Sequence, residues 1–344
     1  MIFKCVASGV IMLCPMSLFA QQASLLITHD YSHVASGGLV QENTSRALAL
    51  IGLTFDVSEH HTVYAEGQAQ RGDDGSEFSG DIQAYSNIDE EDFSKLYELW
   101  LEGDYEKSRI RFKFGLVDAN TEFAYVDNAG EFINSSMGFS PTIAYLPTYP
   151  EPRPSLNLFI GLASSSNLGF GLYVDEDDEL FIVSEWKTEF DKMLFKIGLW
   201  HQSGDVERFD QAGTEDGAIG YYAIAEGEAS LGLAQSSNSG WYTQLGYTDK
   251  SVSAINIHFG AGLTFFDTFQ RKGDAFGLGV TYVKTSQYLS SELNKDETSF
   301  ELFYRAQVTE NIAIKPDIQF IASPASSPDV KDALVLTFRT ELSF

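Results

Sequence analysis

The chain has 344 residues, and its 49 Asp and Glu against 22 Lys and Arg give a formal net charge of −27. A surface this acidic repels a phosphate backbone, which argues against a nucleic-acid partner. Only 44% of the residues are hydrophobic, although Phe, Tyr and Gly are abundant, and no segment after the N-terminus is apolar enough for a transmembrane helix. This combination is typical of a membrane barrel, in which every second strand residue faces water.

The first residues of the chain resemble an export signal. Lys4 supplies a positive charge, Val6–Leu13 is apolar, and a cleavage point follows Ala20. We therefore expect a signal peptide at 1–20 and a single outer-membrane β-barrel domain at 21–344.

Segments of alternating apolar and polar residues recur through the rest of the chain, and we interpret them as strands. The sixteen predicted strands are 24–35, 46–57, 62–71, 95–104, 109–117, 155–162, 167–175, 180–190, 192–202, 219–230, 239–247, 254–265, 275–287, 297–308, 311–321 and 333–344. The fold class is therefore all-β, a transmembrane antiparallel barrel wide enough for an aqueous channel. The connections mostly alternate between short turns and long external loops, as expected for such a barrel. The long ones include Gly72–Ser94, Asp118–Pro154 and Ser203–Ile219.

The last predicted strand, 333–344, shows the alternation most clearly. Leu336, Phe338 and the terminal Phe344 fall on one face, whereas Arg339 falls on the other. A basic residue at mid-membrane on the lipid face would cost about 2–4 kcal/mol, so we expect the strand charges to point into the lumen. Pro316 falls on the lipid face of its strand and cannot donate a hydrogen bond to its neighbour, which predicts a bulge or a local fray.

The longest connection, Asp118–Pro154, follows the fifth predicted strand and is rich in aromatic and aliphatic residues. These residues favour burial, and burial inside a wide barrel means folding into the lumen and narrowing it. The alternative is an external cap packed on neighbouring loops. The polar residues of this connection that we expect at a constriction are Asp118, Asn120, Glu122, Asp127, Asn128, Glu131 and Asn134.

Lumen-facing residues near the middle of their strands are candidates for the opposite side of the constriction. These wall candidates are Glu98, Trp100, Lys113, Arg305, Lys315, Asp317 and Arg339, and Lys196 has a similar predicted height. Acids and bases at one height bind hydroxyl groups, and an aromatic ring covers the C–H face of a sugar. The alternative is a charged wall that only holds water.

Several stretches together resemble the carbohydrate-selective porin family (OprB type) of Gram-negative outer membranes. The similarity is carried by the final strand and by Leu96–Trp100, Gly115–Phe123, Phe132–Pro141, Glu301–Arg305 and Lys315–Gln319. The resemblance implies a sixteen-stranded barrel that admits glucose and other sugars by diffusion, with a constriction of inward loops and of arginine, acidic and aromatic side chains. The chain departs from the family pattern after Tyr149-Pro150, and its loops are more acidic.

We therefore predict a sugar-selective porin of the outer membrane. The expected partners are small sugars, membrane lipid and lipopolysaccharide, and the barrel-assembly machinery, which would recognise Phe344. A general cation-preferring porin is the alternative that the net charge favours. An enzyme is disfavoured because the six histidines have no accompanying Gly-x-Ser-x-Gly motif, and a structural barrel would need no inward charges. We expect no cofactor and no metal, because no calcium-loop motif occurs.

Overall fold

The computed structural model describes residues 22–175, 177–229, 236, 238–289 and 296–344. The predicted signal peptide at 1–20 lies outside the described residues. None of the helices in the described part of the chain is long and apolar enough to cross a membrane.

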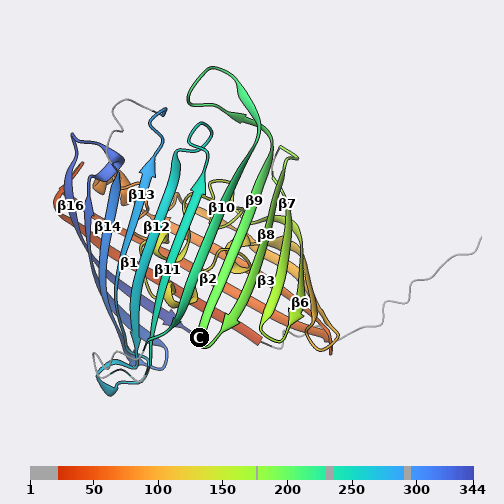
Figure 1. Cartoon of the computed structure of the whole chain (residues 1–344). Helices are drawn as coiled ribbons and strands as arrows, with labels where there is room; N and C mark the ends of the chain where they lie inside the picture. Colours follow the sequence, from red (N-terminus) through yellow and green to blue (C-terminus); the bar gives the residue numbers. More distant parts are fainter. Residues whose placement is uncertain (1–21, 176, 230–235, 237, 290–295) are drawn as a thin grey trace, which may run out of the picture.

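Sixteen antiparallel strands form a closed barrel (Figure 1), as the alternation predicts. The strands are β1 (Gln22–Gly38), β2 (Asn43–Ser58), β3 (His61–Gly72), β4 (Phe93–Tyr105), β5 (Ile110–Val117), β6 (Arg153–Ala163), β7 (Ser166–Val174), β8 (Leu180–Phe190), β9 (Met193–Glu207), β10 (Thr214–Glu228), β11 (Asn238–Thr248), β12 (Ile255–Phe266), β13 (Ala275–Thr285), β14 (Glu297–Thr309), β15 (Ile312–Ala322) and β16 (Lys331–Ser343). Each strand pairs with its neighbours in sequence, and β1 pairs with β16, so the sheet has no free edge.

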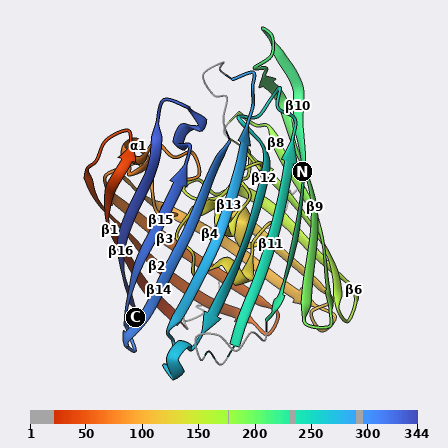
Figure 2. The ribbon, with the colours of Figure 1, turned by 60° about the vertical axis from the view of Figure 1, so that its left-hand side comes forward.

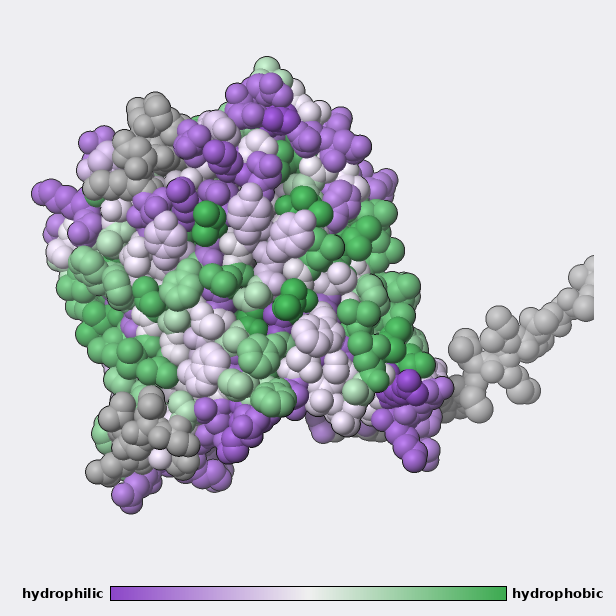
Figure 3. All heavy atoms as spheres, in the orientation of Figure 1, coloured by the Kyte–Doolittle hydropathy of each residue, from purple (hydrophilic) through white to green (hydrophobic). Residues whose placement is uncertain are grey.

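The two faces of the wall differ as expected for a barrel in lipid. On β16, Leu336 and Phe338 are 39% and 46% exposed on the outside, whereas Val335 and Arg339 are buried on the inside. Figure 3 shows hydrophobic residues in a band across the middle of the molecule, with hydrophilic residues gathered at both ends. The predicted assignment of faces in the last strand is confirmed.

Pro316 lies on the outer face of β15, and it leaves a local fray without a bulge. The paired positions of β14 and β15 skip from Phe303 and Asp317 to Ala306 and Ile314 without a change of register. The missing N–H of proline accounts for this interruption. On the other side, Pro316 remains paired in register with Phe338 of β16.

The predicted loop at Ser203–Ile219 is wrong. Strand β9 continues to Glu207 and β10 begins at Thr214, so the two strands project as a long hairpin (Figure 1, green). Strand residues 203–207 and 214–217 are polar or Gly except for the buried Val206, so the alternation that marks a membrane strand is lost. A bulge between Asp216 and Ala218, at Gly217 with φ +84°, further disturbs the pattern.

Two connections turn into the barrel: residues 73–92 between β3 and β4, which we call the first inner loop, and residues 118–152 between β5 and β6, which we call the second inner loop. Figure 2 shows part of the second (yellow) behind β12 and β13. The expectation that Gly72–Ser94 is an external loop is wrong, because Ser86 donates a hydrogen bond of 2.6 Å to Asp30 on the inner wall and Tyr85 is fully buried. The loops also bond to each other, through Asn87 N–H to the Ile133 carbonyl at 2.7 Å.

A charge on the outer face of β14 should destabilise the barrel. Leu302 is exposed there near the middle of the strand, and we expect Leu302→Lys to lower the free energy of unfolding by about 2–4 kcal/mol, because lipid cannot solvate the ammonium group. Urea titration in phospholipid vesicles, followed by tryptophan fluorescence, measures the change. Thr54→Lys, on the inner face of β2, is the matched control, and equal losses for both variants would contradict the assigned faces.

Candidate functional site

The second inner loop is held against the wall by acid–base pairs along its length. Three successive acids of the loop each meet a wall lysine, in the pairs Glu122–Lys113, Asp127–Lys196 at 3.2 Å and Glu131–Lys315 at 3.0 Å. The lysines belong to β5, β9 and β15. The loop therefore follows the inside of the wall over much of the circumference of the barrel.

Wall carboxylates accept the backbone N–H groups of the same loop. Glu301 of β14 accepts two, from Ile133 at 2.7 Å and from Asn134 at 3.0 Å. Three further bonds of this kind are Asp118 N–H to Glu98 at 2.9 Å, Ala124 N–H to Glu185 at 3.0 Å and Asn128 N–H to Glu226 at 2.9 Å. An irregular segment inside a barrel has no sheet partner, so these side chains replace the strand ladder.

Wall donors satisfy several loop carbonyls in turn. Lys196 donates to the Tyr125 carbonyl at 2.5 Å, and Lys315 donates to the Glu131 carbonyl at 2.8 Å. Gln244 of β11 donates to the carbonyls of Ser136 and Met137 at 2.9 and 2.7 Å. Inward side chains of the wall therefore pair with N–H groups and with carbonyl groups of the loop backbone.

The charged cluster where β4 and β5 meet the second inner loop contains three of the predicted site residues, Trp100, Lys113 and Glu122. Glu122 pairs with Lys113 and with Arg111, and the Lys113 ammonium lies 4.0 Å from the centroid of the Trp100 ring. The ring of Tyr64 lies 5.0 Å from Trp100. Because Lys113 and Tyr64 already contact the Trp100 ring, less of the ring is available to pack against a sugar than the sequence analysis expects.

A second cluster joins β14, β15 and β16 to the same loop. Arg305 is 2.9 Å from Glu341 and 3.6 Å from Glu131, and Lys315 is 3.2 Å from Glu341. Arg305, Lys315 and Glu131 are thus brought together, as the prediction of an acid–base ring requires.

Arg339 and Asp317 are buried beside the second cluster, and Arg339 is the cross-strand partner of Lys315. Arg339 makes two bonds to Asp30, at 2.7 and 2.8 Å, and one of 2.8 Å to Asn87 in the first inner loop. Asp317 accepts a bond of 3.1 Å from Gln319. The geometry makes Arg339 an anchor for the first inner loop, with its guanidinium already occupied.

A cavity of about 340 Å³ is enclosed by the second inner loop and bordered by Asn87 of the first, and we call it the amide cavity. Its lining is largely uncharged: Asn87, Asn120, Tyr125, Ala129, Gly130, Phe132, Asn134, Ser135, Gly138, Phe139, Thr148 and Tyr149, with Asp118 the one acid. The Asp118 carboxylate is occupied by Tyr97, Thr148 and the N–H of Asn120. The cavity lining is therefore polar and aromatic with little net charge. Of its amides, Asn134 already bonds to Gln319 and to the Ser136 N–H, and the Asn87 oxygen accepts from Arg339.

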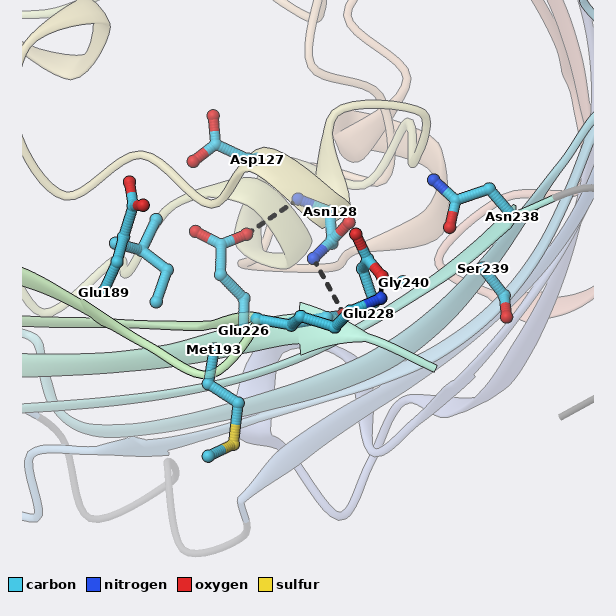
Figure 4. A pocket seen from close by; sticks show the side chains of 12 residues that line it. Asp127, Asn128, Glu189, Met193, Glu226, Glu228, Asn238, Ser239 and Gly240 are labelled. Atoms are coloured by element: carbon cyan, nitrogen blue, oxygen red, sulfur yellow. Dashed lines mark hydrogen bonds and ion pairs between the residues drawn. The ribbon is translucent and has the colours of Figure 1, made fainter. Parts of the chain in front are cut away.

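A smaller cavity of about 180 Å³, which we call the charged cavity, lies toward the end with the short turns. It is lined by Arg111, Thr121, Glu122, Tyr125, Asp127, Phe159, Asn167, Gly169, Glu185, Lys187 and Lys196. Three bases and three acids balance there. Farther along, Asp127 and Asn128 border a third pocket of about 250 Å³ (Figure 4), in which Asn128 bonds to Glu226 and to the Gly227 carbonyl.

Several residues of the site fall outside the predicted candidates. They are Asp30, Asn87, Arg111, Tyr125, Glu185, Glu226, Glu301 and Glu341. The alternation predicts only that those on strands face inward, and it does not say which of them contact a loop. Within the described residues, no group of three His, Cys, Asp or Glu is arranged to hold a metal ion.

Comparison with known proteins agrees with this architecture. Residues 189–344 match the model of the carbohydrate-selective porin, OprB family, so the resemblance noted in the sequence is confirmed over that part of the chain. A comparison with curated protein sequences finds no match.

Solved porins share the fold at low sequence identity. The high-pH structure of Pseudomonas putida OprB is 14% identical with a TM-score of 0.84, and 94% of each chain is covered. The low-pH structure of the same protein has a TM-score of 0.62 at 14% identity, covering 94% of this chain and 92% of that one. Salmonella typhi OmpF in complex with daunomycin has a TM-score of 0.65 at 13% identity, covering 94% of this chain and 97% of that one. The protein is a multi-pass β-barrel of the outer membrane with a porin fold, and it is not an enzyme.

Removing the Glu301 carboxylate should release the second inner loop. In Glu301→Ala two buried N–H groups lose their acceptor, at about 1–3 kcal/mol each, so the loop detaches more often. We expect noisier single-channel currents and faster cleavage of residues 118–152 by protease. Glu310→Ala, in the exposed turn between β14 and β15, is the control, and unchanged noise in Glu301→Ala would contradict the anchoring role.

The ion pairs of Glu122 with Arg111 and Lys113 should persist in mild acid. Burial alone favours the neutral carboxyl, but the bond from Arg111 and the charges of Lys113 and Arg111 hold the pKa of Glu122 below its ordinary value. A depressed pKa stabilises the fold above the unfolded pKa, roughly 4.3, and this stability is lost as the pH falls through the folded pKa. We expect the difference in unfolding free energy between wild type and Glu122→Gln to stay constant from about pH 7 to pH 5 and to vanish in stronger acid. Urea titrations across this range measure it, with Glu106→Gln as the exposed control, and a difference already lost by pH 5 would contradict the ion pairs.

Proposed function

We propose that the protein lets small neutral sugars such as glucose diffuse across the outer membrane through a weakly binding passage. The amide cavity carries this proposal. Three asparagine amides and several hydroxyls line it beside aromatic rings, and such groups bond to sugar hydroxyls and pack against C–H groups without favouring an ion. The family match over residues 189–344 supports the same solute class.

The site must bind weakly if it is to conduct. A solute that passes by diffusion has to leave as readily as it enters, and a millimolar site corresponds to about −4 kcal/mol. The predicted candidate Asn120 borders the amide cavity, and Glu122 and Asp127 border the charged cavity, so we propose these three as contacts of the solute. For Asn134, Glu98, Asp317 and Arg339, burial and existing bonds support a role in holding the loops instead.

A general cation-preferring porin is the second candidate. The net charge of −27 and the acids around the pocket in Figure 4, among them Glu189, Glu226 and Glu228, favour it. Cation preference arises from charge at the mouths, whereas sugar selectivity requires binding at the narrow part, so the two can be measured separately.

We also propose that membrane lipid and lipopolysaccharide surround the hydrophobic band, and that the barrel-assembly machinery recognises the C-terminal strand. Phe344 supports the second proposal because its backbone pairs with Leu25 at 2.9 and 3.0 Å while its side chain is 67% exposed. A ring held in place by its backbone and open on the outside suits recognition.

Sugars should enter faster than their size alone would allow. We expect proteoliposomes containing the protein to swell faster in glucose than in a non-sugar solute of equal size, because the amide cavity binds hydroxyl groups. Reversal potentials in a salt gradient measure cation preference on the same preparation. Equal swelling rates together with a strong cation preference would favour the general porin, and an absence of conductance would exclude both channels.

A further inference from the structure

Tyr125 is held so that its backbone stays on the wall while its ring faces the lumen. The Lys196 ammonium binds its carbonyl at 2.5 Å, and the N–H of the preceding residue, Ala124, donates to Glu185 at 3.0 Å. Ala124 and Val126 are buried, but Tyr125 is 39% exposed. The side chain is therefore directed into open space by contacts that do not involve its ring.

The ring borders two cavities of different chemistry. Tyr125 is the residue common to the linings of the amide cavity and the charged cavity. A solute that moves from one cavity to the other thus passes Tyr125. On the side of Tyr125 toward the long loops the lining consists of amides and hydroxyls, and on the side toward the short turns it consists of acids and bases in equal number.

The ring also has a free face, in contrast to Trp100. Among the described residues no aromatic ring stacks on Tyr125, and its nearest cation, Lys196 Nζ, lies 5.9 Å from the ring centroid. Trp100 has Lys113 at 4.0 Å and Tyr64 at 5.0 Å. Of the two aromatic residues, Tyr125 is better placed to receive the C–H face of a pyranose.

We propose that Tyr125 is the specificity-determining residue of the passage, the ring on which a sugar packs as it crosses between the two cavities. The inference rests on the proposed function. It adds Tyr125 as the residue that the sugar contacts and the charged cavity as a second site on its path. The charged cavity then bonds the hydroxyls with Asn167 and with acids and bases that balance in charge, which suits a neutral polyol.

Single-channel recording in planar bilayers with a glucose concentration series tests the proposal. We expect Tyr125→Leu to weaken sugar-dependent blocking about two- to tenfold, the range for loss of one aromatic contact, and to raise the conductance in salt. Tyr125→Phe keeps the ring and retains most of the blocking. Tyr288→Leu is the matched control, because Tyr288 has the same 39% exposure but lies outside both cavities, beyond β13.

A second variant disturbs the ring without replacing it. A Cβ atom at Gly130 would lie 2.9 Å from the Tyr125 hydroxyl, and the φ of −61° at Gly130 accepts alanine, so Gly130→Ala displaces the ring. We expect it to weaken blocking as Tyr125→Leu does. Heat-modifiable migration in gels verifies that each variant folds.

The outcomes separate this inference from the proposed function. If wild type is blocked by glucose and Tyr125→Leu is blocked equally, the role of Tyr125 is wrong and the sugar channel stands. If Tyr288→Leu weakens blocking as much as Tyr125→Leu does, the effect is not local to the cavities and the role of Tyr125 is again wrong. If wild type shows no sugar-dependent blocking, the proposed function fails and the inference fails with it.

Discussion

The position of the second inner loop depends on one requirement, that a buried backbone must find hydrogen-bond partners. A loop inside a barrel has neither a sheet neighbour nor bulk water on the side facing the wall. Here Glu301 accepts two loop N–H groups, and Lys315 and Gln244 donate to loop carbonyls. If one of these partners is lost, a buried polar group remains unpaired, which costs more than a typical hydrogen bond contributes. The inward charges of the wall are therefore first of all the partners of the loop.

This requirement changes the meaning of the charged residues at mid-height. A ring of acids and bases in a porin is easily read as the surface that the solute contacts. In this barrel many members of the ring are occupied, since Lys113 contacts Glu122 and Trp100, and Arg339 is bound by Asp30. The charges hold the loops in place, and the groups that remain for a solute are largely uncharged polar groups and aromatic rings.

The sequence determines the wall far better than the contents of the lumen. Alternation within a strand is a local signal, because lipid on one side and water or packed polar groups on the other demand it residue by residue, and this is why β16 was predicted with the correct faces. The signal disappears in the polar ends of β9 and β10, so alternation predicts a loop where the structure has a projecting hairpin. The inward course of residues 73–92 depends on Asp30 and Glu297, which are distant in sequence, and no local pattern reveals such partners.

The net charge and the neutral passage are compatible because they act at different places. Much of the acidic excess lies on loops and turns at the ends of the barrel, as at Asp177, Asp178 and Glu106, where salt screens charges beyond about 8–10 Å. At the narrow part, the three loop acids each meet a lysine, and the charged cavity balances three bases with three acids. In the proposed sugar channel, an ion would meet a field mainly at the mouths, whereas a sugar would meet its binding groups inside. Selectivity for a neutral solute then depends on the aromatic and amide lining, and a change of charge at the loops should alter ion currents while leaving sugar binding nearly unchanged.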